Sequence, residues 1–168
     1  MRTNHASRLL CLCLLSSGLG LGTLQADCVT PPPQMVSWWR AENSAFDQVG
    51  TNHGTLLNGA TFAAKLVGQA FSFNASSNAG VVVPSTPALN PTGAITIEAW
   101  VKPASFPNPG PTIVRKDQNG GGIPQYALLI GDGLAPGVVH FNIGGIAFVT
   151  GGSVPSNVWT HVAGTYDR

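Results

Sequence analysis

Short apolar runs divided by clusters of Gly, Pro and Asn restrict the fold of this chain more than any other feature. After residue 34, no stretch carries apolar residues at helical spacing over three turns. Val, Ile, Phe and Trp gather instead in runs of strand length, and turn residues separate the runs. The pattern predicts an all-β fold with strands at Met35–Trp39, Ala60–Ala63, Ala70–Phe73, Gly80–Val83, Ala94–Lys102, Thr112–Arg115, Tyr126–Ile130, Val138–Ile143, Ile146–Thr150 and Trp159–Tyr166.

The clearest strand is AITIEAWVK, Ala94–Lys102, because its residue types alternate. One face carries Ile95, Ile97, Ala99 and Val101, and the other carries Thr96, Glu98, Trp100 and Lys102. Such a strand packs one face on a core and leaves the other face wetter. We also expect a hairpin that turns at Gly144 and Gly145, since adjacent glycines supply the positive φ angles of tight turns.

Many short strands without helices bury their apolar faces by stacking sheets on one another. We therefore predict an antiparallel two-sheet jelly-roll sandwich. The segment STPALNP, Ser85–Pro91, is expected to form one helical turn between the sheets.

The N-terminus has the features of a secretory signal peptide over residues 1–26. Arg2 and Arg8 precede the apolar run LLCLCLL, and Ala26 offers a small residue at a cleavage point. An uncleaved anchor is the alternative. Residues 27–34 read as a Pro-rich linker, and residues 35–168 as one domain. We expect a secreted, extracellular or cell-surface protein with no membrane insertion after cleavage.

The charge balance restricts the partners of the mature chain. Of the eight Lys and Arg residues, two are removed with the signal peptide. The mature chain therefore has six basic and seven acidic residues. No basic stripe is available for nucleic acid and no polybasic patch for anionic lipid. Cys28 is the one cysteine outside the signal peptide, so an internal disulfide is not expected.

Five segments in order resemble one family: MVSWWRAEN, DQVGTNHGTLLNGATF, LVGQAFSFNA, LNPTGAITIEAWVKP and VPSNVWTHVAGTYD. They are similar to the laminin G-like, concanavalin A-type jelly-roll modules (lectin and glucanase fold) that secreted bacterial proteins carry. The resemblance covers about Met35 to Arg168. Family members continue beyond the equivalent of GTYD with an LYVNG-like strand, so we expect a domain that is incomplete at its C-terminus and belongs to a larger chain.

Catalysis by paired carboxylates is not expected. Glycoside hydrolases need two carboxyl groups beside the scissile bond, and no two acidic residues here stand at alternate positions. Glu98 is the one carboxylate in the middle of a clear strand. No GxSxG nucleophile motif and no CxxC or HxxxH metal pattern is present. We expect no enzymatic activity; a fragment of a glycoside hydrolase is the alternative.

The loop DQVGTNHGT, Asp47–Thr55, offers oxygen ligands in a Gly-punctuated turn. Calcium takes six to eight oxygens from carboxylates, amides and carbonyls. In related modules a loop in this region often helps hold one calcium ion, and the resemblance points to Asp47, Asn52, His53 and Gly54, through carbonyls for the last two. The alternative is an Asx turn, in which Asp and Asn bond their own backbone.

Trp100 and Glu98 are the candidate ligand-binding residues. At least one of the adjacent Trp38 and Trp39 is expected in a packed position, and so is Trp159, whereas Trp100 shares the polar face of its strand with Glu98. The resemblance implies a non-catalytic recognition or adhesion module that binds a glycan. A structural spacer, or a module that binds another extracellular protein, is the alternative function.

Overall fold

A computed structural model describes residues 31–107, 110–118, 122, 124–131 and 135–168. The predicted signal peptide and residues 27–30 of the predicted linker lie outside this part of the chain. The description below concerns the compact unit Pro33–Arg168. Across the described residues, no helix is both long enough and apolar enough to cross a membrane.

The described residues form an all-β structure with two short 3₁₀ turns, η1 (Ala75–Ser77) and η2 (Pro87–Leu89). The helical turn that was expected within Ser85–Pro91 is confirmed by η2. The strands are β1 (Thr55–Leu57), β2 (Thr61–Ala64), β3 (Gln69–Ser72), β4 (Gly80–Val82), β5 (Ile95–Val101), β6 (Thr112–Asp117), β7 (Pro124–Ile130), β8 (Val138–Ile143), β9 (Ala147–Ser153) and β10 (Thr160–Tyr166).

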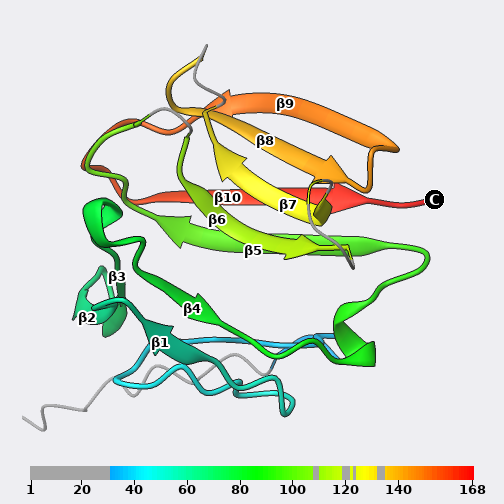
Figure 1. Cartoon of the computed structure of the whole chain (residues 1–168), viewed down its shortest axis with the longest axis horizontal. Helices are drawn as coiled ribbons and strands as arrows, with labels where there is room; N and C mark the ends of the chain where they lie inside the picture. Colours follow the sequence, from blue (N-terminus) through cyan, green and yellow to red (C-terminus); the bar gives the residue numbers. More distant parts are fainter. Residues whose placement is uncertain (1–30, 108–109, 119–121, 123, 132–134) are drawn as a thin grey trace, which may run out of the picture. The chain divides into compact units, whose positions relative to one another are not determined.

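All the strand pairs are antiparallel, as predicted. Strands β6, β7, β8 and β9 form a four-stranded sheet in chain order (Figure 1). Strand β5 pairs with β10 across a long gap in sequence, and β1–β4 and β2–β3 form two further pairs. The all-β antiparallel architecture is consistent with a jelly-roll sandwich.

The core lies between the β5–β10 pair and the four-stranded sheet. Its buried side chains come from β7, β8, β10 and the loop before β10: Tyr126, Leu128, Ile130, Phe141, Ile143, Val154 and Val162. The apolar face of β5 packs on this cluster through Ile95, Ile97, Ala99 and Val101, which confirms the face predicted from alternation. Burial of these side chains is the main favourable contribution to folding.

The predicted hairpin turn is confirmed at the β8–β9 connection. Gly144 and Gly145 have φ angles of +48° and +73°, which other residues adopt only with strain. The N–H of Ile146 donates to the carbonyl of Ile143 at 2.6 Å and closes the turn. The turn sets the register, with Ile143 opposite Ala147.

The predicted strand Met35–Trp39 is wrong. Only an isolated bridge between Trp39 and Asp47 forms there. The N–H of Trp38 donates to the side-chain carboxylate of Asp47 rather than to a neighbouring strand. Strand β1 begins at Thr55, the last residue of the predicted loop Asp47–Thr55, and no strand was predicted over Thr55–Leu57.

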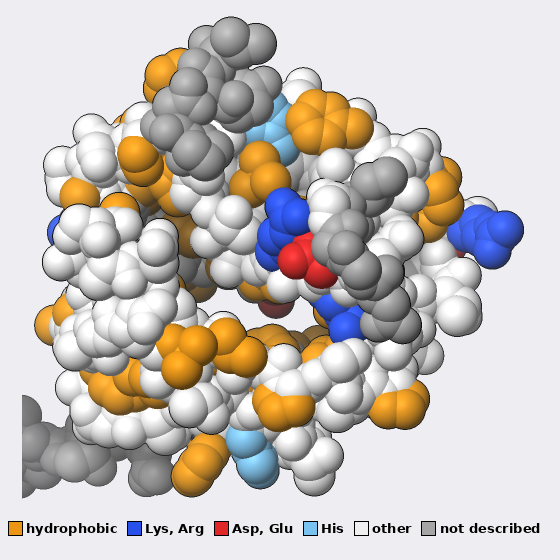
Figure 2. All heavy atoms as spheres, in the orientation of Figure 1, with side chains coloured by type: hydrophobic (Ala, Val, Ile, Leu, Met, Phe, Trp, Pro, Cys, Tyr) orange, Lys and Arg blue, Asp and Glu red, His pale blue; other side chains and the backbone are white. Residues whose placement is uncertain are grey.

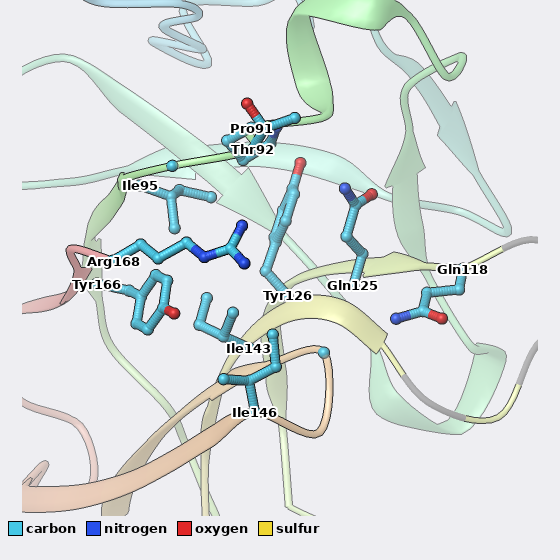
Figure 3. Close-up of a pocket in the computed structure, with 12 residues that line it drawn as sticks. Pro91, Thr92, Ile95, Gln118, Gln125, Tyr126, Ile143, Ile146, Tyr166 and Arg168 are labelled. Carbon is cyan, nitrogen blue, oxygen red and sulfur yellow. The ribbon is translucent and has the colours of Figure 1, made fainter.

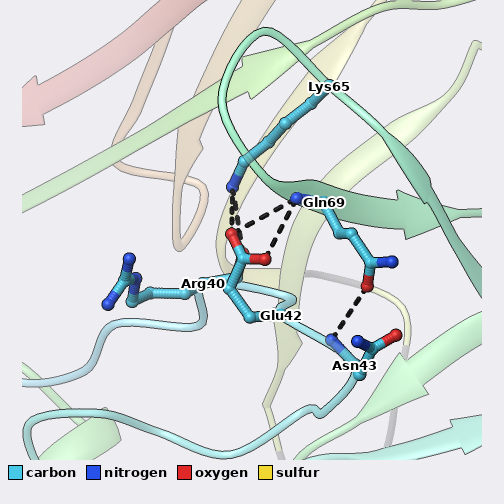
Figure 4. A network of polar contacts seen from close by, with 5 residues as sticks. All are labelled: Arg40, Glu42, Asn43, Lys65 and Gln69. Carbon is cyan, nitrogen blue, oxygen red and sulfur yellow. Dashed lines mark hydrogen bonds and ion pairs between the residues drawn. The ribbon is translucent and has the colours of Figure 1, made fainter.

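A polar network holds the β2–β3 hairpin against the segment Arg40–Asn43 (Figure 4). Both carboxylate oxygens of Glu42 accept the backbone N–H of Gln69, at 3.2 and 3.1 Å, and Lys65 lies 3.4 Å away. The hydrogen bond from Gln69 lowers the pKa of Glu42. Gly68 has a φ of +69°, and a Cβ there would overlap the Glu42 carboxylate, so the network needs a glycine at this position.

Candidate functional site

The outer face of the β5–β10 pair carries both residues that the sequence singled out for ligand binding. The register places Trp100 opposite His161, Glu98 opposite Ala163, and Thr96 opposite Thr165. All six side chains point away from the core and are exposed. The period of two in each strand therefore assembles one polar strip from residues that lie more than sixty positions apart in the chain.

Trp100 is the aromatic surface of this strip, with 58% of the residue exposed. The ring of His161 lies 5.3 Å from the Trp100 ring, between centroids, at an interplanar angle of 53°. The Nε2 atom of His161 lies 3.5 Å from Oε2 of Glu98. An open indole face with hydrogen-bonding groups at its edge suits a ligand that has both an apolar face and hydroxyl groups.

His161 is the member of the site that the sequence interpretation missed. The sequence favoured a structural role for it, because a histidine on a strand near a core is most often packed or hydrogen-bonded. The signal that could have found it is its position in β10, which alternates outward with Ala163 and Thr165. Thr96 and Thr165 extend the strip, and their hydroxyl oxygens lie 3.1 Å apart.

The predicted calcium loop centres on Asp47, which is buried. Its Oδ1 accepts the backbone N–H groups of Trp38 at 2.9 Å and Val49 at 3.0 Å, and its Oδ2 accepts the N–H of Asn52 at 3.2 Å. The bond from Val49, two residues further on, is that of an Asx turn. The carboxylate thus organises the surrounding backbone.

These hydrogen bonds determine the acidity of Asp47. Burial is the largest single influence and raises the pKa of the carboxyl group. The N–H groups of Trp38, Val49 and Gly50 and the hydroxyl of Ser37 act together in the opposite direction and lower the pKa to about 2. Asp47 is therefore an anion at every physiological pH, because its hydrogen bonds stabilise the charged form.

Asn52 is buried beside Asp47, and its polar atoms are engaged with protein. Its Oδ1 accepts the hydroxyl of Thr86 at 2.7 Å, and its Nδ2 donates to Oγ of Ser37 at 2.7 Å. Its carbonyl oxygen accepts the indole N–H of Trp39 at 2.8 Å. This indole bond gives Trp39 the packed position that the sequence predicted for one of the two adjacent tryptophans.

The other two predicted ligands are placed differently. The Nδ1 atom of His53 accepts the backbone N–H of Asp47 at 3.2 Å. The N–H of Gly54 donates to the carbonyl of Ala45 at 2.8 Å, and a Cβ on Gly54 would overlap Val81. Both residues fix the loop to its neighbours.

The engagement of the loop's oxygen atoms determines whether the loop fits calcium. Both Asp47 oxygens, Oδ1 of Asn52 and the Asn52 carbonyl each accept an N–H or O–H donor, whereas calcium needs six to eight oxygens turned toward one point. No cluster of three or more His, Cys, Asp or Glu residues occurs in the described part of the chain. The arrangement fits an Asx turn better than a calcium centre, and calcium binding stays a prediction of the sequence.

Two cavities lie elsewhere in the described structure. One, of about 210 Å³, is lined by Pro91, Thr92, Gly93, Ile95, Gln118, Gln125, Tyr126, Ile143, Gly144, Ile146, Tyr166 and Arg168. Figure 3 shows the Arg168 side chain extending toward Tyr126. The hydroxyl of Tyr126 donates to the carbonyl of Leu89 at 3.2 Å, and burial raises the pKa of this phenol.

The second cavity, of about 490 Å³, has an entirely polar set of lining residues: Ser85, Asn90, Lys116, Asp117, Gln118 and Gln125. The ammonium group of Lys116 donates to the hydroxyl of Ser85 at 2.8 Å. Figure 2 shows a hollow in this face of the molecule with charged side chains at its margin. The cavity has no aromatic wall, so it offers no stacking surface comparable with Trp100.

Comparison with known proteins gives one family. The laminin G-like family model described as the concanavalin A-like lectin/glucanases superfamily matches residues 75–168, which are more than half of the chain. The match contains β5 and β10 with Trp100, Glu98 and His161, and it begins after the Asp47 loop. No curated protein and no solved structure gives a significant match. The chain belongs to the concanavalin A-like lectin/glucanase superfamily.

Proposed function

We propose that this protein is an extracellular, non-catalytic recognition module that binds carbohydrate on the outer face of the β5–β10 pair. The observation that carries the proposal is Trp100, whose exposed indole lies beside the Glu98–His161 pair on one face. Exposure of so much apolar indole surface to water is unfavourable. A sugar ring that covers the indole removes this surface from solvent, and its removal favours binding. Membership of the superfamily supports a carbohydrate- or protein-binding role.

Hydrogen bonding would complete the recognition of a sugar. The Glu98 carboxylate accepts hydrogen bonds from hydroxyl groups, and the hydroxyls of Thr96 and Thr165 both donate and accept them. The site stands on two paired strands of a sheet that packs on the core, so its side chains are held without a large ordering cost on binding.

The absence of catalysis is part of the proposal. Hydrolysis of a glycosidic bond needs a second carboxyl group beside the first. Neither β5 nor β10 contains an acidic residue other than Glu98. The extracellular location rests on the predicted signal peptide and on the usual location of laminin G-like domains.

The test is a glycan array probed with the labelled protein, followed by calorimetric titration of the best glycan. We expect Trp100→Ala to weaken binding by at least about tenfold, since an anchoring aromatic contributes more than 1.4 kcal/mol. Phe46→Ala is the matched control, because Phe46 is equally exposed (59%) but lies outside this face. Glu98→Gln should weaken glycan binding. Neither this variant nor the unmutated protein should hydrolyse the bound glycan.

Silence across plant, algal and host glycans would count against carbohydrate recognition. The protein-interaction alternative predicts that silence, together with a specific extracellular partner whose binding also depends on Trp100. Equal binding by Trp100→Ala and the unmutated protein would remove this face from either function.

A further inference from the structure

The larger, polar cavity is a site apart from the outer face that carries Trp100. One ammonium, one carboxylate, one hydroxyl and three carboxamide groups line it, from Lys116, Asp117, Ser85, Asn90, Gln118 and Gln125. Its volume of about 490 Å³ is within the range of about 300–1,000 Å³ that is usual for small-molecule sites. Among the described residues, no aromatic and no purely aliphatic side chain lines it. A ligand that fits this cavity is therefore polar over its whole surface.

The register of β6 with β7 turns Lys116 toward the inner face of the four-stranded sheet. Lys116 lies directly opposite Tyr126, and directly opposed residues of an antiparallel pair project from the same face. Tyr126 is a buried member of the core. The flanking Arg115 and Asp117 are exposed, whereas Lys116 is half-buried. A charge on the inward side of a sheet is costly unless a partner compensates it.

The ammonium group of Lys116 forms no ion pair with a carboxylate in the described part of the chain. It donates to the hydroxyl of Ser85 at 2.8 Å, which holds it at the cavity and leaves two of its three N–H groups for a ligand. The carboxylate of Asp117 is engaged by Arg115, whose Nε lies 2.6 Å from Oδ1. The cavity thus presents one uncompensated positive charge, and this charge favours an anion.

The three carboxamide groups suit the uncharged part of a ligand. The amides of Gln118 and Gln125 form no hydrogen bond with another described residue. Asn90 donates from Nδ2 to the carbonyl of Thr86 at 3.1 Å and keeps its Oδ1 as an acceptor. A carboxamide both donates and accepts hydrogen bonds, as a hydroxyl group does. The lining therefore complements an anion that also carries several hydroxyl groups.

We propose that this cavity binds a hydroxylated carboxylate of the sugar-acid class, with the carboxylate on the ammonium group of Lys116. The hydroxyl groups of the ligand bond to the carboxamides of the lining. A hydrogen bond between two charged groups is stronger than a neutral one, so the carboxylate contributes most of the affinity. The hydroxyl groups discriminate against simpler carboxylates. A free sugar acid and a terminal uronic residue of a glycan share this chemistry.

The test is calorimetric titration of the protein with D-glucuronate, D-gluconate, D-glucose and acetate. We expect both sugar acids to bind at least about tenfold more tightly than D-glucose, which lacks the carboxylate, and than acetate, which lacks the hydroxyl groups. Lys116→Gln should weaken the binding of both sugar acids by at least about tenfold, and Lys116→Arg should weaken it less. Lys102→Gln is the matched control, because it removes the same charge from an exposed lysine outside the cavity.

A second variant covers the case in which Lys116→Gln fails to fold, which circular dichroism would reveal. Gln125→Leu keeps the charge of the cavity and removes one carboxamide, so it should also weaken the binding of both sugar acids. A titration with a short oligouronide identifies the source of the ligand. Binding of the oligouronide indicates a terminal residue of a glycan, and binding of the monosaccharides alone indicates a free sugar acid.

Each of four results would overturn the proposal. They are no binding of either sugar acid, equal binding of D-glucose, an equal loss in Lys102→Gln, and full binding by a folded Lys116→Gln. The last result would leave Lys116 as an inward charge that only discourages pairing at the β6 edge. Trp100→Ala should bind both sugar acids as the unmutated protein does, so failure of the outer-face glycan site and failure of this cavity are distinguished.

Discussion

Gly164 on β10 lies directly against the ring of Phe141 on β8, and a Cβ at this position would overlap the ring. This close approach brings the β5–β10 pair onto the four-stranded sheet. We predict that Gly164→Ala lowers the free energy of unfolding by about 1–3 kcal/mol, as overpacking of a core does. Urea denaturation measures the change. Gly80→Ala is the control, since a Cβ at Gly80 has no atom within 4 Å; equal effects of the two substitutions would contradict the packing argument.

A comparison of Gly68 with Gly59 separates the effect of backbone strain from the effect of a steric clash. Gly68 and Gly59 both have positive φ, at +69° and +79°, but only at Gly68 does a Cβ meet another group, the Glu42 carboxylate. We predict that Gly59→Ala destabilises by about 1 kcal/mol from backbone strain alone, and that Gly68→Ala destabilises by more. Thermal unfolding of the two variants checks this order. In a Glu42→Ala background the excess at Gly68 should shrink, and a persistent excess would point to another cause.

The ionisation of Asp47 makes the stability of the fold depend on pH in the acidic range. Its folded pKa of about 2 is below the ordinary 3.8, so the unfolded chain binds a proton more readily. Asp47 therefore contributes its full share to the free energy of unfolding above the ordinary pKa, and this contribution is lost as the pH falls toward 2. The contribution amounts to about 2 kcal/mol. Denaturation midpoints between neutral pH and pH 2 should show this decline. Asp47→Asn should be less stable at neutral pH and have a flatter profile; an unchanged profile would contradict the assignment.

Calcium titration separates the two interpretations of the Asp47 loop. Because both carboxylate oxygens already accept N–H donors, we expect no heat and no gain in the free energy of unfolding when calcium is added. The calcium hypothesis predicts both, and predicts that Asp47→Ala abolishes them. Binding by the unmutated protein that is lost in Asp47→Ala would restore the loop as a metal site.

Local pattern was a sufficient guide where one strand faces a core on one side. The alternation of Ala94–Lys102 predicted the buried face of β5, because burying every second side chain forces a period of two in the sequence. The hairpin at Gly144 and Gly145 was also predictable, since its φ angles depend on the turn residues themselves. The same alternation predicted that Trp100 and Glu98 share the outward face of this strand.

Long-range hydrogen bonds explain the failures. Met35–Trp39 has the composition of a strand, but the Asp47 carboxylate takes the N–H of Trp38 and leaves only one bridge. A propensity is a weak preference, and a partner that is distant in the chain overrides it. The hydrogen bonds of Asn52 with Thr86 and Ser37 could not be predicted for the same reason.

The amino-acid sequence was enough to establish an antiparallel all-β fold, the inward face of β5 and the exposure of Trp100, because each depends on alternation within one strand. The addition of His161 to Trp100 and Glu98 required the register between β5 and β10, which are joined by nearly sixty intervening residues. Strand order and register depend on the packing of the whole core, so they are properties of the folded chain and not of any single segment.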